Sequence, residues 1–278
     1  MENYIKTIFL LGVLSVILVT VGGLLGGQQG VYMAFAFAML MNGVSYFYSD
    51  KIALKMSGAK PVSKKDAPAL YRSVENLAKK MQIPVPRVYM TPANQANAFA
   101  TGRDPSHASI AVTSGIMDIL TPEELEAVLA HELSHVKNRD ILIASIAAVL
   151  ASAISFLANM SFYGGFGRRD EDNRGSGALG LVLALLVPIA ASLIQLAISR
   201  EREFEADESG AKTMGTGKPL AKALISIHAS AKHAPLATNP AFSSLYISNP
   251  LGGRGGNLLN LFSTHPPVEE RVKRLEKI

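Results

Sequence analysis

The stretch Ala130-His131-Glu132-Leu133-Ser134-His135 decides how the rest of this chain is interpreted. In a helix, residues i and i+4 lie above one another, so His131 and His135 can point at one metal ion. Glu132 follows the first histidine and can reach the open side of that metal. Two neutral imidazoles and an adjacent carboxylate suit zinc, with the carboxylate as general base. An ordinary helix can carry the same residues by chance, so the surroundings must decide.

The residues before the motif predict a well-defined helix start. Thr121 suits the N-cap, Pro122 suits the first helical position, and Glu124 completes a capping box. Apolar residues then recur at helical spacing. Neither glycine nor proline interrupts residues 123–159, so we expect this helix to run with little interruption into the next apolar stretch.

The composition favours a membrane protein. Of 278 residues, 49% are hydrophobic and 18% are charged. The formal charge of +5 is not gathered into a basic patch, which argues against a nucleic-acid partner. The chain has no cysteine, so disulfides, thiol catalysis and cysteine-ligated zinc are excluded. Any metal must therefore be held by nitrogen and oxygen, and six histidines are available.

Two pairs of apolar segments are long enough to cross a membrane, which takes roughly 20 residues per helix. The first pair is an expected hairpin of about Ile5–Leu25 and Val31–Phe47, divided by a turn rich in glycine and glutamine. A cleaved signal peptide is the alternative for the first half, and a buried soluble hairpin is the alternative for the pair. The second pair is the uncharged runs 141–167 and 175–199, with two full spans plus an embedded pair as the fallback.

Lysines follow the first hairpin, whereas its turn carries no charge. The positive-inside rule therefore places the N-terminus and the chain after Phe47 in the cytoplasm. The metal helix leads into the second apolar pair, so the site should lie close to the cytoplasmic membrane surface. The lysines concerned are Lys51, Lys55, Lys60, Lys64 and Lys65.

The region between the two apolar pairs has the pattern of a soluble domain. A second capping box, Ser63 to Asp66, precedes a helix with an apolar stripe, which prolines end at Pro84 and Pro86. Three short strands are expected, and together they predict a small sheet of about three strands beside the metal helix. The strand candidates are Arg87–Thr91, Asn97–Thr101 and Ser109–Thr113.

A catalytic zinc site needs a third protein ligand, and the segment Ser199–Asp207 offers four carboxylates. Periodicity alone does not choose between Glu201, Glu203 and Glu205. Small residues at Ala206 and Gly210 would let another helix approach closely. A solvated, charged helix end is the alternative interpretation.

Together these motifs resemble the HtpX-type membrane zinc metalloproteases, which have the eukaryotic CAAX prenyl proteases as distant relatives. The resemblance rests on the H-E-x-x-H motif and the E-F-x-A-D pattern of Glu203–Asp207. It extends through Asn97–Gly102, His131–Asp140 and Ser263–Pro267. One departure is Arg139, where many relatives have a small residue, and it leaves the ligands untouched.

Patterns and resemblance predict a mostly α, α+β fold with about four transmembrane helices. A gluzincin-like metalloprotease domain with a small β-sheet would contain the site. The expected parts are an N-terminal transmembrane hairpin (1–50), the first part of the cytoplasmic protease domain (51–140), a second transmembrane or partly embedded pair (141–199), and the second part of the protease domain (200–278).

The resemblance implies a role for each residue of the site. His131, His135 and Glu203 would be the zinc ligands, and Glu132 the catalytic acid/base. Asp207 would accept the other ring N–H of a ligating histidine and fix its tautomer. Asn97 and Ala98 would lie on the edge strand that holds an extended substrate. His265 is a candidate for stabilising the oxyanion, with packing in a turn as the alternative.

The function implied is that of a zinc-dependent endopeptidase, with one Zn²⁺ per chain, in the bacterial inner membrane. Its substrates would be misfolded or damaged membrane proteins and unfolded proteins, in protein quality control and the stress response. Its partners would be the bilayer and these protein substrates, without nucleic acid. One alternative is a prenyl-protein protease, which should need further spans. Another is a catalytically silent zinc-containing scaffold or holdase, against which Glu132 argues because a structural site needs no base.

Overall fold

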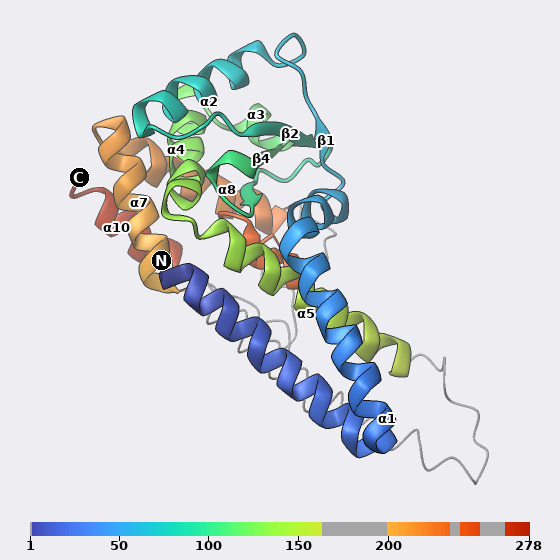
Figure 1. Cartoon of the computed structure of the whole chain (residues 1–278). Helices are drawn as coiled ribbons and strands as arrows, with labels where there is room; N and C mark the ends of the chain where they lie inside the picture. Colours follow the sequence, from blue (N-terminus) through green and yellow to red (C-terminus); the bar gives the residue numbers. More distant parts are fainter. Residues whose placement is uncertain (1, 163–198, 234–239, 251–264) are drawn as a thin grey trace.

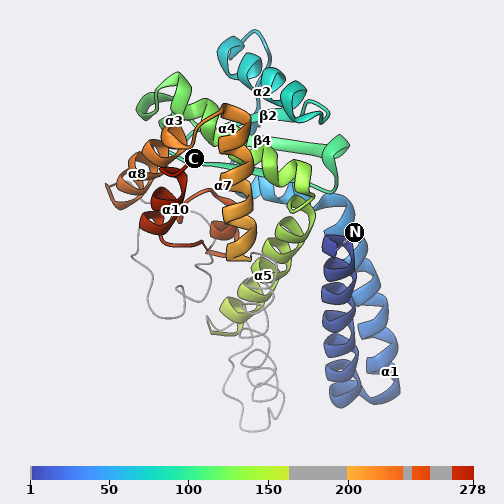
Figure 2. The same cartoon turned by 90° about the vertical axis from the view of Figure 1, so that its left-hand side faces the viewer.

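The computed structural model describes residues 2–162, 199–233, 240–250 and 265–278. A globular part carries the C-terminus, and a helical hairpin that begins at the N-terminal end of the chain and one further helix project from it in the same direction (Figures 1 and 2). Residues 175–198 of the expected fourth span lie outside the described ranges. The number of four spans, and the division of the chain into four parts, therefore stay predictions.

The projecting hairpin is α1 (Glu2–Met56), whose helical course is broken at Gly27. Gly27 has φ 55° and ψ −143°, a backbone conformation that glycine adopts without a steric penalty. The two arms run side by side away from the globular part (Figure 2). They approach closely near the turn, since a Cβ atom on Gly22 would lie 2.5 Å from the carbonyl oxygen of Gly30.

The arms of the hairpin are long and apolar enough to cross a membrane. They comprise Ile5–Leu24 and Gly26–Met56. Large apolar side chains such as Phe35 and Leu40 are exposed on them, as expected for helices that face lipid. The two apolar N-terminal helices expected from the sequence are confirmed.

Four strands form a mixed sheet in the order β1-β2-β4-β3. Strands β2 and β4 are parallel, whereas β1 and β3 are antiparallel to their neighbours. The three expected strands lie within one residue of their predicted positions. The additional strand β1 is too short to leave an alternating pattern in the sequence. The bounds are β1 (Lys60–Pro61), β2 (Arg87–Thr91), β3 (Ala98–Gly102) and β4 (Ala108–Thr113).

Side chains alternate across the sheet and build an apolar core on each face. Val88, Ile110 and Val112 lie in the larger core with α2 (Pro68–Met81) and α4 (Pro122–Asn138). The smaller core joins Phe99 and Ala111 to α1 and Tyr246. The remaining elements are α3 (Ser114–Ile119), α5 (Ile141–Phe162), α7 (Arg200–Met214), α8 (Lys218–His233), α10 (Val268–Leu275), and the 3-10 helices η1 (Pro105–His107) and η2 (Pro240–Leu245).

The two predicted capping boxes have different outcomes. Thr121 and Glu124 form the box that starts α4, as expected. Ser63 and Asp66 also exchange hydrogen bonds, but they close a turn, and α2 begins only at Pro68. The residue before a proline is disfavoured in the helical region, and Ala67 accordingly has φ −136° and ψ 67°.

The expected continuous helix from the metal motif into the next apolar stretch is corrected by the structure. Helix α4 ends at Asn138, and Arg139 takes a left-handed conformation with φ 62°. The Arg139 N–H then donates to carbonyls of the last helical turn, which is a common way to close a helix. Helix α5 starts afresh at Ile141, and its first part is buried against α1, β3 and η2.

Candidate metal centre and catalytic site

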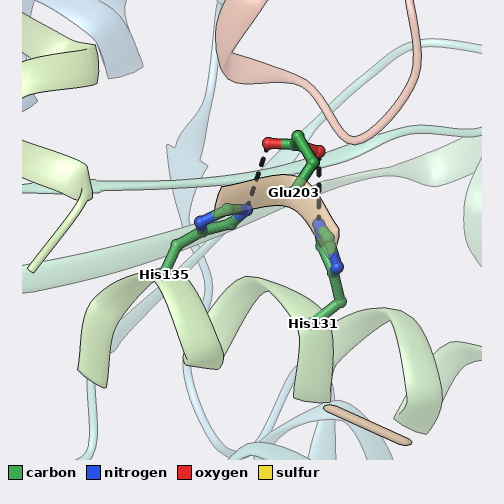
Figure 3. Close-up of side chains that lie close together, drawn as sticks. All are labelled: His131, His135 and Glu203. Carbon is green, nitrogen blue, oxygen red and sulfur yellow. Dashed lines mark ion pairs between the residues drawn. The ribbon is translucent and has the colours of Figure 1, made fainter. Parts of the chain in front are cut away.

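Helix α4 places His131 and His135 one turn apart on the same face (Figure 3). Their ring centroids are 4.8 Å apart and the ring planes are nearly perpendicular, at 89°. His131 is 1% exposed, because α4 lies between the sheet and helices α7 and α8. The burial of the helix therefore fixes where both imidazoles can point.

Helix α7 brings Glu203 over the two histidines (Figure 3). Its Oε1 lies 3.4 Å from His135 Nε2, and its Oε2 lies 3.9 Å from His131 Nε2. The other two candidates for the third ligand, Glu201 and Glu205, are exposed. Of the three, Glu203 is thus the residue that lies beside the histidines.

Gly210 allows this approach of α7 to α4. A Cβ atom at Gly210 would lie 3.0 Å from the backbone nitrogen of His131, which is tighter than nine in ten real Cβ contacts. The expectation that small residues on this helix permit close approach is confirmed.

The residues present fit a metal ion. One donor atom from each of His131, His135 and Glu203 can be chosen so that all three lie within 4.8 Å of one another. Ligands about 2.0–2.1 Å from a tetrahedral zinc lie roughly 3.3 Å from each other, which the 3.4 Å between His135 and Glu203 already matches. The Oε2 atom of Glu203 is buried and has no hydrogen-bond partner among the described residues. A buried carboxylate oxygen of this kind is expected to have a partner, and a cation at this point would supply it.

Each histidine is held by an aspartate through its other ring nitrogen. His131 Nδ1 lies 2.9 Å from Asp207 Oδ1, and His135 Nδ1 lies 3.1 Å from Asp140 Oδ2. An N–H on Nδ1 that donates to the carboxylate leaves Nε2 unprotonated and free to bind a metal. Asp207 was expected in this position, whereas Asp140 was only part of the matched motif.

Arg271 of α10 is the largest side chain that lies fully inside the protein at this site. Its Nε and Nη2 donate to the two oxygens of Asp207 at 2.8 and 2.7 Å. Its Nη1 lies 3.6 Å from Glu203 Oε2. Burial opposes the charge, but the Asp207 and Glu203 carboxylates raise the pKa of Arg271 further, so it stays a cation. Sequence reasoning missed this residue.

The signal that could have found Arg271 is its place in the apolar stripe of the last helix. Val268, Val272 and Leu275 mark the face that packs on the domain, and Arg271 lies three residues after the first and four before the last. A charged residue on the buried face of a short helix calls for a buried partner of opposite charge. The sequence signal for Asp140 is weaker. Its position just after the end of α4 is the only hint that its side chain could reach His135.

The charges of the site shift its pKa values strongly. Burial opposes ionisation of Glu203, but His265, His135 and Arg271 lower its pKa to about 2. Burial would lower the pKa of His135, yet the hydrogen bond to Asp140 and the negative charges of Glu203 and Glu132 raise it to about 9. The carboxylates of this site therefore favour a positive charge that lies between them.

Glu132 lines a small pocket beside His135. Burial raises the pKa of its carboxyl group to about 7, although His135 and a hydrogen bond from the backbone of Ala100 oppose this. Helix α5 and η2 close the pocket with Ile141, Ala144 and Leu245. A buried carboxyl with a pKa near neutral can both accept and return a proton.

The other expected site residues lie nearby. Strand β3 is an edge strand, as expected, but Asn97 is buried and donates to the carbonyl of Ser248 at 2.9 Å. The carbonyl of Ala98 accepts the N–H of Ile247 at 2.9 Å. His265 lies with its Nε2 atom 3.7 Å from Glu203 Oε2.

Comparisons with known proteins identify the family of the chain and a similar fold. The model of "Peptidase family M48" matches residues 64–278. A protein named protease HtpX homolog from Pelotomaculum thermopropionicum is 49% identical and covers 98% of each chain. The one from a Sulfurihydrogenibium species is 50% identical and covers 100% of this chain and 97% of its own. The crystal structure of S. mikatae Ste24p shares the fold, with a TM-score of 0.53 and 19% identity, over 99% of this chain and 66% of that one.

Proposed function

The chain belongs to peptidase family M48 and is a membrane metalloprotease of the HtpX type, and we propose that it is a zinc endopeptidase whose metal is held by His131, His135 and Glu203. The convergence of these three side chains around a buried carboxylate oxygen that accepts no hydrogen bond from the described residues supports this proposal most directly. Two imidazole nitrogens and one carboxylate oxygen in a chain without cysteine suit zinc.

Zinc would supply Lewis-acid polarisation of the scissile carbonyl group. The aspartates would keep the histidines in the tautomer that leaves each Nε2 for the metal. Asp207 does this for His131 and Asp140 for His135, by the contacts described above.

Glu132 is the residue proposed to move the proton. Its carboxylate would take a proton from the attacking water and pass it to the departing amine of the cleaved bond. Its pKa of about 7 makes both transfers accessible near neutral pH. The backbone N–H of Ala100 would orient the carboxylate toward the pocket that it shares with His135.

Substrate would lie extended along strand β3, where Asn97 and Ala98 mark the start of the edge. Ile247 binds the Ala98 carbonyl and Glu132 binds the Ala100 N–H, so added pairing would begin beyond these two groups on the strand. His265, near Glu203, is proposed to donate a hydrogen bond to the oxyanion.

Misfolded or damaged membrane proteins, together with unfolded proteins, are the proposed substrates, in protein quality control and the stress response. The pocket beside Glu132 is lined by Ile141 and Ala144, in the first turn of α5, which projects alongside the apolar hairpin (Figure 1). This position supports access by chain segments that lie at a membrane surface. We place the protein in the bacterial inner membrane, and we place the site in the cytoplasm because Lys51 and Lys55 lie at the end of the second arm of the hairpin.

Cleavage of an unfolded protein by the purified full chain in detergent tests this function. The wild type, Glu132→Gln and Glu126→Gln would each be prepared metal-free and then loaded with zinc. We expect cleavage by zinc-loaded wild type and by Glu126→Gln, a carboxylate on the same helix outside the pocket. Glu132→Gln should bind zinc and lose nearly all activity. A wild-type protein that binds zinc but does not cleave the substrate would instead support the alternative of a catalytically silent, zinc-containing scaffold.

A further inference from the structure

Arg271 makes polar contacts in two directions from one buried position. In one direction it donates twice to Asp207, which in turn holds His131 Nδ1 at 2.9 Å. In the other direction its Nη1 donates to the carbonyl of Ile247 at 2.9 Å. The side chain is 1% exposed, so these contacts are made away from water.

Ile247 belongs to residues 243–250, which we call the cleft segment. This segment is fixed to the start of β3 by several contacts and lines the pocket beside Glu132. The contacts are Ile247 N–H to the Ala98 carbonyl at 2.9 Å, Asn97 to the Ser248 carbonyl at 2.9 Å, Gln95 to the Pro250 carbonyl at 2.7 Å, and the rings of Phe99 and Tyr246 at 5.0 Å.

A guanidinium group is the side chain suited to this position. It donates in a fixed fork, so it can bind both oxygens of Asp207 and still reach a carbonyl with its remaining nitrogen. Lysine offers one ammonium group and cannot make the same set of bonds. Arg274 on the same helix is half exposed and pairs with Glu270 at the surface. The buried contacts are therefore particular to Arg271.

We propose that Arg271 is a positioning residue that couples the metal ligand His131 to the cleft segment. Through Asp207 it fixes one imidazole, and through Ile247 it fixes the backbone beside the edge strand. Metal binding then steadies the cleft segment, and a steadier cleft segment strengthens metal binding, because coupling between two sites is reciprocal. This inference rests on the proposed metal centre.

The test uses the full chain in detergent, with Zn²⁺ as the probe. Arg271→Lys is compared with the wild type and with Arg274→Lys, the matched control on the same helix. Zinc affinity is measured by competition with a chelator. Hydrogen exchange of peptides within residues 243–250 is measured with and without zinc. Co²⁺ absorption then reports whether the ligand geometry is kept.

We expect Arg271→Lys to bind zinc about 10- to 100-fold more weakly, as is usual when a residue supporting a ligand is changed. Zinc should slow hydrogen exchange of the cleft segment in the wild type and in Arg274→Lys, and this slowing should be lost in Arg271→Lys. Unchanged affinity, or slowing that persists in Arg271→Lys, would overturn the coupling.

If Arg271→Lys does not fold, the coupling is tested with Asp207→Asn instead. It weakens the same connection on the histidine side while Arg271 can still bind Ile247. Loss of the zinc-dependent slowing in this variant supports the coupling, and retention of the slowing overturns the coupling through Asp207. Wild type that binds no zinc overturns the proposed metal centre itself. Wild type that binds zinc without slowing exchange in the cleft segment overturns only the coupling.

Discussion

At the scale of single residues, the proposed metal centre contains two histidine–aspartate pairs in different surroundings. Asp207 lies inside the protein and is bound twice by Arg271. Asp140 is the residue just before α5 and lines the pocket, with Arg202 Nη1 3.9 Å from its Oδ1 atom. Both aspartates fix the orientation of an imidazole, so changing either one should affect the metal more than the fold.

Asp140→Asn should lower zinc affinity roughly tenfold, toward the small end of the effects seen for such supporting residues. Asparagine can still accept the His135 N–H, but it lacks the charge, and before the first residue of a helix such as α5 it is as favourable as aspartate. Chelator competition gives the affinity. Asp118→Asn, an exposed aspartate elsewhere, serves as the control. Equal affinities in all three proteins would contradict the role of Asp140.

Zinc binding should release protons, because the metal-free site holds His135 in its protonated form. The pKa of His135 is raised to about 9, so at pH 8 the imidazole is charged and must lose its proton to bind zinc. Affinity should therefore rise with pH, by about tenfold per unit for one released proton, and level off above pH 9. Calorimetry in two buffers of different ionisation enthalpy counts the protons. Heats that are equal in both buffers would exclude the release.

The sequence alone could predict those residues of the site that are recognised by their spacing along one helix. The i, i+4 histidines and the adjacent Glu132 follow from helical geometry alone. The third ligand could not be chosen by periodicity, because Glu201, Glu203 and Glu205 all lie in one charged helix. Arg271 was missed because its partner Asp207 is 64 residues away, and only the folded chain brings them together.

At the scale of elements, the centre depends on how closely α7 packs on α4. Gly210 lies where a Cβ atom would be 3.0 Å from the His131 nitrogen. Glu203 lies two turns earlier on the same helix, so any shift of α7 moves this carboxylate relative to the histidines. The packing of the two helices therefore sets the size of the metal site.

Gly210→Ala should weaken zinc binding several-fold. Alanine gains about 1 kcal/mol in helix propensity, whereas overpacking at a tight contact costs about 1–3 kcal/mol. We therefore expect no gain in the thermal unfolding temperature of the metal-free protein, together with a lower zinc affinity. Ser209→Ala, one residue earlier, is the control for the alanine itself. A more stable protein with unchanged zinc affinity would show that α7 has room at this point.

Local sequence signals predicted most of the described elements. The box at Thr121 and Glu124 started α4, and the three strands appeared close to their expected positions. The end of α4 was not predicted, because Arg139 adopts a left-handed conformation that glycine or asparagine usually marks. A glycine or asparagine at this position would indicate the helix end in the sequence, whereas an arginine gives no such indication.

At the scale of the whole molecule, the proposed active site lies where the projecting helices join the globular part. The pocket includes Ile141 and Ala144 of α5, and α1 packs along α5. Figures 1 and 2 show both helices leaving the globular part in the same direction. A bilayer around the hairpin would thus bring lipid close to the pocket and leave the sheet and α2 on the far side.

This arrangement predicts a membrane topology that can be measured directly. The hairpin turn and the globular part should face opposite sides of the membrane, with lysines such as Lys51 and Lys55 on the cytoplasmic side. Because the chain contains no cysteine, a single introduced cysteine is the only thiol available for labelling. Gln28→Cys places it at the exposed turn, and Lys80→Cys places it on the exposed surface of α2.

In spheroplasts of a bacterial host, a membrane-impermeant maleimide should label Gln28→Cys at once. Lys80→Cys should react only after the membrane is permeabilised, and the cysteine-free wild type should stay unlabelled in both conditions. The opposite order would place the protease domain outside the cytoplasm and overturn the orientation inferred from the lysines. Labelling of both positions in intact spheroplasts would mean that the hairpin does not cross, because its turn and the globular part would then share one side of the membrane.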